Sequence, residues 1–181
     1  GGLGNFIGKS VSDTIQTAPV ELALSVTEAD GDTLSTDRMT VRFDERAAPG
    51  WDAYEATKLT PPAPNGYATL TSPIERAGTL ARRRLAAEPF PSGEEAATVP
   101  LSARSVDATG TATVHLLEAP DAAGALALTD TDADTTIDLR SADYAFALDA
   151  GDGQIDTPDE ARFRLHATSA SLPVELVDFN A

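Results

Sequence analysis

Closely spaced carboxylates are the first feature of this sequence that could support chemistry. Asp130, Asp132 and Asp134 alternate at the start of the segment 130–138. Hard cations such as Ca²⁺ take several oxygen ligands, and loop carboxylates at this spacing can supply them. The pattern therefore predicts at most weak calcium binding at these three aspartates. The favoured interpretation is a solvated acidic turn that discourages pairing between sheet edges.

A second acidic loop covers residues 149–160. Part of it, including Asp152, Gly153 and Asp159, is similar to a helix-flanked calcium loop, but two of the earlier ligand positions carry Leu148 and Ala150. These residues have no side-chain oxygen to offer a cation. A solvated loop is the favoured interpretation of this segment.

Histidine chemistry has two candidate residues, His115 and His166. A histidine-based hydrolase needs a nucleophile and a carboxylate that converge on the imidazole. Both histidines lie at polar-facing positions of predicted strands, which favours surface histidines. The chain has no cysteine, which excludes thiol nucleophiles and zinc-thiolate sites. A glycosidase would need two carboxylates about 5–10 Å apart across a cleft, and the sequence has no aromatic-rich run to hold a sugar there. We expect no catalytic residues and no cofactor other than weakly bound calcium.

The only tryptophan, Trp51, lies in a short segment with further polar residues. A sugar-binding interpretation stacks Trp51 and Tyr54 on a sugar ring. The favoured structural interpretation has Trp51 cap the core, while Lys58 pairs with Asp52 or Glu55. The two interpretations predict a carbohydrate-binding module and a structural module, respectively.

Charge limits the possible partners of the chain. The net charge is -16, from 29 acidic and 13 basic residues. Nucleic acids and anionic membranes bind clustered Lys and Arg, so neither is an expected partner. The one basic cluster, Arg82 to Arg84, is interpreted as a solvated strand or turn. No apolar run approaches the roughly 20 residues that cross a bilayer, so membrane insertion is not expected.

The elements that position these residues follow a period of two, in which apolar and polar side chains alternate. Segments 20–26 and 38–43 are expected to form a hairpin or to be near neighbours. Segment 78–88 has good helix propensity, but a strand is the preferred interpretation. The remaining predicted strands are 67–71, 99–103, 111–116, 125–129, 144–148, 162–166 and 174–179.

About ten short strands joined by Gly-, Pro- and Asp-rich turns predict an all-β fold. We expect a two-sheet antiparallel β-sandwich, Ig-like or jelly-roll-like. Residues 1–17 are expected to form a flexible N-terminal arm or an edge strand, and residues 18–181 a single sandwich domain.

Several segments, in order, resemble a known family. They are DRMTVRF at 37–43, GWDAYEATKL at 50–59, VPLSA at 99–103, TIDLRSADYAFAL at 136–148, ARFRLH at 161–166 and LPVELVDF at 172–179. Together they resemble the β-sandwich region of secreted and cell-surface proteins of Bacteroidota that precedes a type 9 secretion system sorting domain.

The resemblance implies export, a place at the cell surface or in the medium, and a structural or adhesive role without catalytic residues. The expected partners are other modules of the same surface protein, or copies of this chain joined by strand addition. The arm 1–17 or the strand 174–179 would be the donor. The alternative is a carbohydrate-binding module attached to a secreted enzyme, with glycans as partners.

Overall fold

The computed structural model describes residues 19–44, 46–48, 50–53, 55–59, 66–89, 96–121 and 123–169. These residues form an all-β fold with one short 3₁₀ helix, η1 (Pro158–Glu160). The strands are β1 (Val20–Thr27), β2 (Thr33–Phe43), β3 (Ala56–Thr57), β4 (Tyr67–Arg76), β5 (Thr79–Glu88), β6 (Ala97–Val106), β7 (Gly110–Glu118), β8 (Ala123–Asp130), β9 (Thr135–Asp138), β10 (Tyr144–Leu148) and β11 (Phe163–Ser169). No helix in these ranges is both long and apolar enough to cross a membrane.

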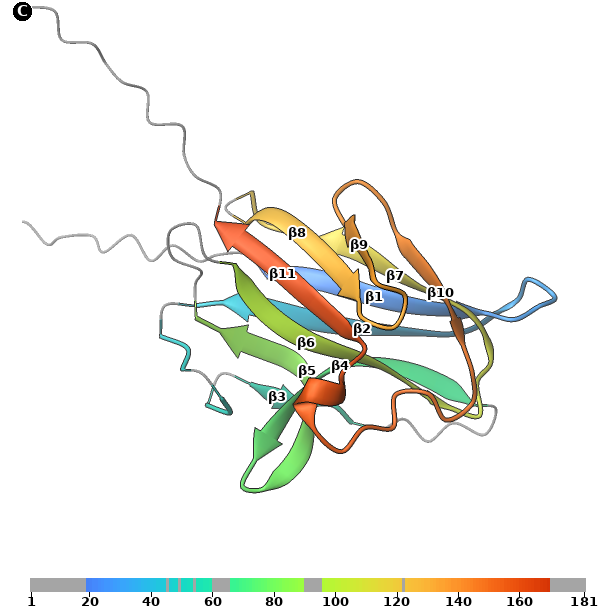
Figure 1. Ribbon diagram of the computed structural model, residues 1–181, viewed down its shortest axis with the longest axis horizontal. Coiled ribbons are helices and arrows are strands. Elements are labelled where there is room, and N and C mark those ends of the chain that lie inside the picture. The colour runs from blue at the N-terminus through green and yellow to red at the C-terminus, as the bar shows by residue number, and fades with distance from the viewer. Residues whose placement is uncertain are drawn as a thin grey trace, which may run out of the picture.

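The strands pair along one continuous path, β10-β7-β1-β2-β5-β4-β6-β11-β8-β9, and β3 adds to β5 (Figure 1). The predicted pairing of segments 20–26 and 38–43 is confirmed, because β1 and β2 are antiparallel neighbours. The preference for a strand over a helix at 78–88 is also confirmed by β5. Segments 1–17 and 174–179 lie outside the described residues.

The expectation of purely antiparallel pairing is wrong at one place. Strands β2 and β5 are parallel, with Thr40 opposite Leu85 and Phe43 opposite Glu88. The chain between these strands contains β3 and β4, which gives it the length that a parallel connection needs. The two separate sheets of the predicted sandwich are not confirmed, because hydrogen bonding continues from one end of the path to the other.

Two central strands change partner along their length. In β4, residues 67–71 pair with β6 and residues 72–76 pair with β5. In β6, residues 97–101 pair with β11 and residues 102–106 pair with β4. Pro73 and Pro100 both lie in halves that have one partner strand, where a missing N–H does not break a second ladder. The sheet therefore turns from one layer into the next without a break.

Side chains of β2 accept hydrogen bonds from the side of β4 that pairs with no described strand at residues 67–71. The amide of Ala68 donates to Ser35 Oγ at 3.1 Å, and the amide of Leu70 donates to Asp37 Oδ2 at 2.8 Å. Lys58 Nζ lies 2.5 Å from Asp37 Oδ1 and balances the charge of this carboxylate. Polar side chains of β2 thus replace the strand ladder that the first half of β4 lacks.

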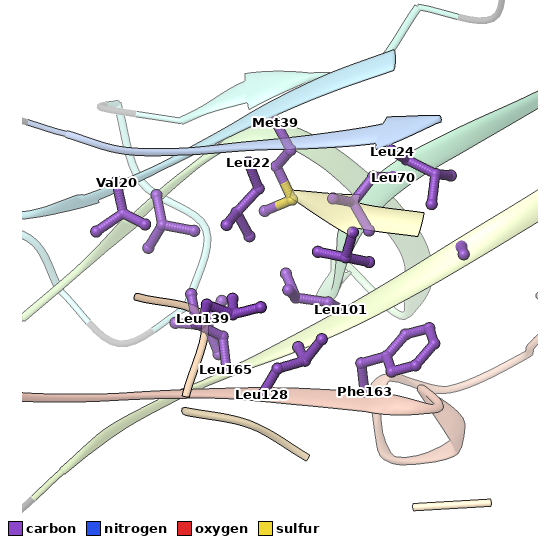
Figure 2. Close-up of a cluster of buried hydrophobic side chains, with 14 of the residues drawn as sticks. Val20, Leu22, Leu24, Met39, Leu70, Leu101, Leu128, Leu139, Phe163 and Leu165 are labelled. Atoms are coloured by element: carbon purple, nitrogen blue, oxygen red, sulfur yellow. The ribbon is translucent and has the colours of Figure 1, made fainter. Parts of the chain in front are cut away.

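One apolar core lies between the layers of strands. Leu22, Leu24 and Met39, from β1 and β2, face Leu128 and residues of β11 (Figure 2). Alternate residues of β1 supply part of it: Val20, Leu22, Leu24 and Val26 have no exposed surface. The period-two pattern correctly predicted which face of this strand is buried.

The two ends of the sheet path are close in the sequence. β9 ends at Asp138 and β10 begins at Tyr144, and a connection of this length spans at most roughly 20 Å. Leu139, within it, is buried, and its amide donates to the carbonyl of Leu126. The sheet must therefore curl so that its first and last strands come near each other.

Candidate functional site

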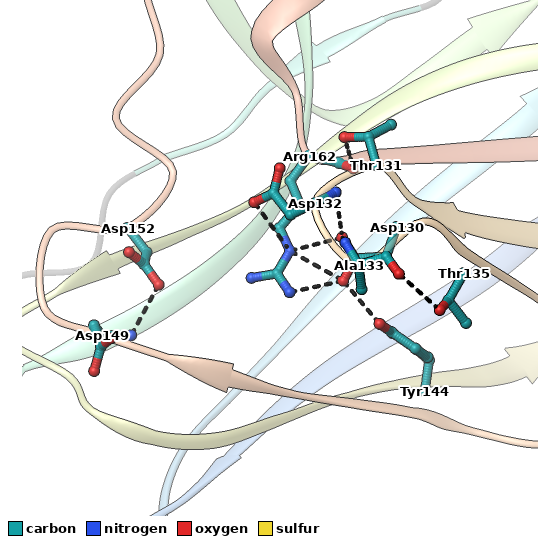
Figure 3. A network of polar contacts seen from close by, with 9 residues as sticks. All are labelled: Asp130, Thr131, Asp132, Ala133, Thr135, Tyr144, Asp149, Asp152 and Arg162. Carbon is teal, nitrogen blue, oxygen red and sulfur yellow. Dashed lines mark hydrogen bonds and ion pairs between the residues drawn. The ribbon is translucent and has the colours of Figure 1, made fainter.

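The acidic turn after β8 is held by an ion pair with Arg162, the residue directly before β11. Asp130 is fully buried, and Arg162 donates to both of its oxygens, with Nε 3.0 Å from Oδ1 and Nη2 2.7 Å from Oδ2 (Figure 3). The hydroxyl of Tyr144 donates to Oδ2 at 2.8 Å. The amide of Asp132 donates to Oδ1 at 3.0 Å. This carboxylate therefore joins the ends of β8, β10 and β11.

The burial and the hydrogen bonds of Asp130 determine its pKa. Burial alone raises the pKa of Asp130, but the hydrogen bonds from Arg162 and Tyr144 outweigh it, and the pKa lies below its usual value. The hydrogen bond to Asp130 raises the pKa of Arg162, although burial acts against it. Arg162 also lies 4.6 Å from the ring centroid of Phe146. The pair is charged at neutral pH and packed against the aromatic part of the core.

The three predicted calcium ligands do not converge. Asp130 is committed to Arg162 and Tyr144, while Asp132 and Asp134 are exposed. Asp132 Oδ2 lies 3.6 Å from Arg162 Nε. In the described ranges, no group of three or more acidic or histidine side chains is placed to hold a metal ion. Any calcium at this turn would depend on Asp132 and Asp134, so its binding would be weak.

Calcium binding at this turn stays a prediction. If it occurs with a dissociation constant near 1 mM, about 10 mM calcium should stabilise the fold by roughly 1.4 kcal/mol and raise the melting temperature by a few degrees over a chelator control. Asp132→Asn should abolish the difference. Equal melting temperatures in calcium and chelator, measured by calorimetry, would remove the calcium prediction.

The second acidic loop packs against the C-terminal half of β6. The amide of Ser105 donates to the carbonyl of Asp152 at 2.9 Å. Gly153 has a φ of +71°, and a Cβ on it would lie 2.3 Å from the carbonyl oxygen of Ala103. Glycine is required here because both the backbone conformation and the close approach exclude a side chain. The loop is a fixed wall of the fold, which its polar sequence did not reveal.

The two acidic loops face one small cavity. It has a volume of about 170 Å³, and its lining includes Asp132, Asp152, Glu160 and Arg162. The carboxylate of Asp152 accepts a hydrogen bond from the amide of Asp149 at 2.9 Å. Among the described residues, Arg162 is the one basic residue on the lining of this cavity.

His115 is the middle residue of a hydrogen-bonded chain of three, Ser25, His115 and Asp143, that the sequence did not predict. Its Nε2 is 2.8 Å from Ser25 Oγ, and its Nδ1 is 2.9 Å from Asp143 Oδ2. This is the connectivity that activates a serine nucleophile. Acyl transfer also needs donors for the developing oxyanion, and the backbone on both edges of β1 around Ser25 is paired with β2 and β7. The arrangement fits a polar tie between β1, β7 and the start of β10, and the absence of catalysis stays a prediction.

The other histidine has a simpler setting. His166 Nδ1 lies 3.0 Å from Thr98 Oγ1, across the pairing of β11 with β6. Thr98 and His166 are directly opposite in the register. A cross-strand polar pair on the outer face is the role that this geometry supports.

Trp51 is half-buried, and the guanidinium of Arg76 lies 4.3 Å from its ring centroid. The predicted pairing of Lys58 with Asp52 or Glu55 is wrong, because Lys58 pairs with Asp37. Tyr54 lies outside the described residues, so the sugar-stacking interpretation stays a prediction.

The solvated interpretation of the arginine cluster is wrong for its middle residue. Arg83 is 2% exposed. One of its terminal nitrogens pairs with Glu55, whose side chain has no exposed surface; the other lies 3.0 Å from Glu88 and donates to Ser72 Oγ at 2.7 Å. Burial raises the pKa of Glu88, although Arg83 acts against it. Adjacent residues of a strand point to opposite faces, so Arg84 is exposed while Arg83 is buried.

Comparison with known proteins gave no relative on which to base a function. No family model matches the chain, and neither the curated proteins nor the solved structures contain a match. The resemblance to Bacteroidota surface proteins therefore stays a prediction.

Proposed function

We propose that the chain is a non-catalytic structural or adhesive module of an exported bacterial surface protein or extracellular fibre. In this proposal it joins copies of itself, or other modules of the same protein, by strand addition. The observation that carries it is that the sheet path ends on β9 and β10, whose outer edges pair with no strand of the described part of the chain. Unpaired backbone groups on an edge strand can template another strand.

The edge of β10 suits an added strand better than that of β9. β10 has five residues, of which Ala145 and Ala147 are exposed and Phe146 and Leu148 are buried. Small outward side chains let another backbone approach closely. β9 has four residues, and Thr135, Thr136 and Asp138 are exposed. A short polar edge of this kind discourages pairing.

A two-sheet sandwich, Ig-like or jelly-roll-like, is the architecture that we propose for this module. Its support is the core in Figure 2, where side chains from β1 and β2 face those of β8 and β11. Strands β4 and β6 would then be the corners, where a strand passes from one sheet to the other.

Export and a place at the cell surface or in the medium are part of the same proposal. The net charge of -16 keeps an exposed module soluble and discourages unspecific association. The resemblance to modules that precede a type 9 secretion sorting domain supports this location.

Self-association tests the proposal by sedimentation velocity over a range of concentrations. We expect oligomers that grow with concentration and that disappear when residues 1–17 or residues 174–179 are deleted, whichever is the donor. Ala147→Lys should weaken them because a lysine on an edge strand opposes pairing. Ala53→Lys, at another exposed alanine, should leave them unchanged. A monomer at every concentration would contradict strand addition between copies.

A further inference from the structure

A second cavity lies beside β5 and β6 under the loop that follows β10. Its volume is about 370 Å³, and it is lined by Arg82, Arg104, Gln154, Ile155 and Asp156. Cavities that hold small ligands have volumes of roughly 300–1,000 Å³. This cavity is therefore large enough for a small molecule as well as for a single ion.

The wall of this cavity is fixed before any ligand arrives. Gly153 lies against the backbone of Ala103 and Arg104, so the loop cannot move closer to β6. Arg82 Nη2 donates to the carbonyl of Gly153 at 3.3 Å. A preformed site loses little conformational freedom when it binds.

Two arginines of this lining each have a nitrogen that donates no hydrogen bond within the described residues. Arg82 Nη1 and Arg104 Nε are buried and have no hydrogen-bond partner among the described residues, and the same holds for Arg83 Nε in the neighbouring buried cluster. Neither residue forms an ion pair within the described ranges, although Arg46, Arg83 and Arg162 each pair with a carboxylate. Since neither guanidinium group has a carboxylate counter-ion in the described part of the chain, the two together can bind an anion from solution.

The charges of the two arginines also oppose each other. Burial lowers the pKa of Arg82, and the neighbouring charge of Arg104 lowers it further. An anion between the two guanidinium groups would remove this repulsion. Planar guanidinium groups bind phosphate and sulfate oxygens through paired hydrogen bonds.

Asp156 restricts the class of anion. Asp156 is an exposed residue of the same lining. A carboxylate there would repel a free oxyanion, but it can accept a hydrogen bond from a hydroxyl group. The amide of Gln154 can serve a hydroxyl in either direction. The lining therefore combines two cations for an oxyanion with two polar groups for the hydroxyls next to it.

We propose that this cavity binds a phosphate or sulfate monoester of a sugar or similar polyol. Arg82 and Arg104 hold the oxyanion, and Gln154 and Asp156 hold the hydroxyls. The ligand site does not depend on the self-association proposed above. A chain that stays monomeric can still bind the ester, and a chain that binds no ester can still self-associate.

Isothermal titration calorimetry tests the site at constant ionic strength, with glucose 6-phosphate, glucose 6-sulfate, inorganic phosphate, inorganic sulfate and glucose as probes. We expect one or both esters to bind more tightly than the inorganic anions, and glucose not to bind. Arg104→Gln should weaken ester binding roughly tenfold or more, because it removes charge-assisted hydrogen bonds. Asp156→Asn should strengthen the binding of inorganic phosphate.

Arg84→Gln is the matched control, since Arg84 is an exposed arginine on β5, the strand that carries Arg82, and this variant should bind the esters as the unchanged chain does. Arg104→Lys gives a second variant that keeps the charge, and thermal melting without ligand shows that each variant folds. The site would be overturned if no probe binds, or if ester binding persists unchanged in Arg104→Gln. Equal binding of inorganic phosphate and the esters would overturn the assignment to a monoester.

Discussion

Replacing Arg83 by leucine should lower the free energy of unfolding by about 3–5 kcal/mol, which is the usual cost of removing one partner of a buried ion pair. Glu55, whose side chain is fully buried, would lose its cation, and Glu88 would lose its contact at 3.0 Å. Urea denaturation measures the change. Arg84→Leu is the matched control on the exposed face of β5, where we expect less than about 0.5 kcal/mol.

The loss in Arg83→Leu should depend on pH. The folded pKa of Glu88 is raised above 4.5, so the folded state binds more protons than the unfolded state between that value and the raised one. The contribution of Glu88 to stability therefore falls as the pH rises through this window. Arg83 lowers the pKa of Glu88, so this pKa should rise further in Arg83→Leu and the pH window should widen. The variant should therefore lose more stability at pH 7 than at pH 4.5.

A double variant separates the ion pair from simple packing. Arg83→Met combined with Glu55→Leu removes the cation and its fully buried partner, leaves apolar groups of similar volume, and keeps only the partly exposed Glu88. Such replacements of buried pairs are often close to neutral, so the double variant should be more stable than Arg83→Leu alone. A single variant that is as stable as the unchanged chain would show that Arg83 is not buried against Glu55 in solution.

Asp130→Asn should lower the free energy of unfolding by about 3 kcal/mol. This is the lower end of the range for a broken buried pair, because the side chain of Arg162 is 27% exposed and water can partly solvate it. The neutral amide keeps the size of the side chain but not its charge, so Arg162 loses its counterion. Thermal and urea denaturation at pH 7 measure the loss.

Acid should reduce this difference. The folded pKa of Asp130 lies below its unfolded value of 3.8, so the unfolded state binds more protons in this window. The stabilising contribution is complete above pH 3.8 and is lost as the pH falls through the folded pKa. Asp134→Asn is the control, since Asp134 is exposed and asparagine tolerates its φ of +47°. If both variants cost the same, Asp130 does not act through a buried pair.

Local sequence predicts the strands of this fold well because each strand carries its own alternation. Val20 to Val26 place their apolar residues on the core side, and Tyr144 to Leu148 do the same with Phe146 and Leu148. These patterns depend only on the two-residue repeat of an extended chain. They contain no information on which strand pairs with which, and the parallel pairing of β2 with β5 could not be predicted from them.

The polar interactions could be predicted only in part, because their partners are distant in the sequence. The three adjacent arginines predict a solvated segment, whereas Arg83 pairs with Glu55, which is 28 residues away in the sequence. The spacing of Asp130 suggested a cation ligand, whereas its partner Arg162 is 32 residues away. Ser25 and His115 are separated by 90 residues. Contacts of this kind follow from the strand order, which alternation does not determine.

The change of partner within β4 and β6 has a consequence for how the molecule opens. Since each of these strands hydrogen-bonds to two different neighbours, neither layer can detach while the other stays intact. The amide protons of β4 and β6 that donate to a neighbouring strand should therefore exchange with solvent only through global opening, and the protein should unfold as a single cooperative unit.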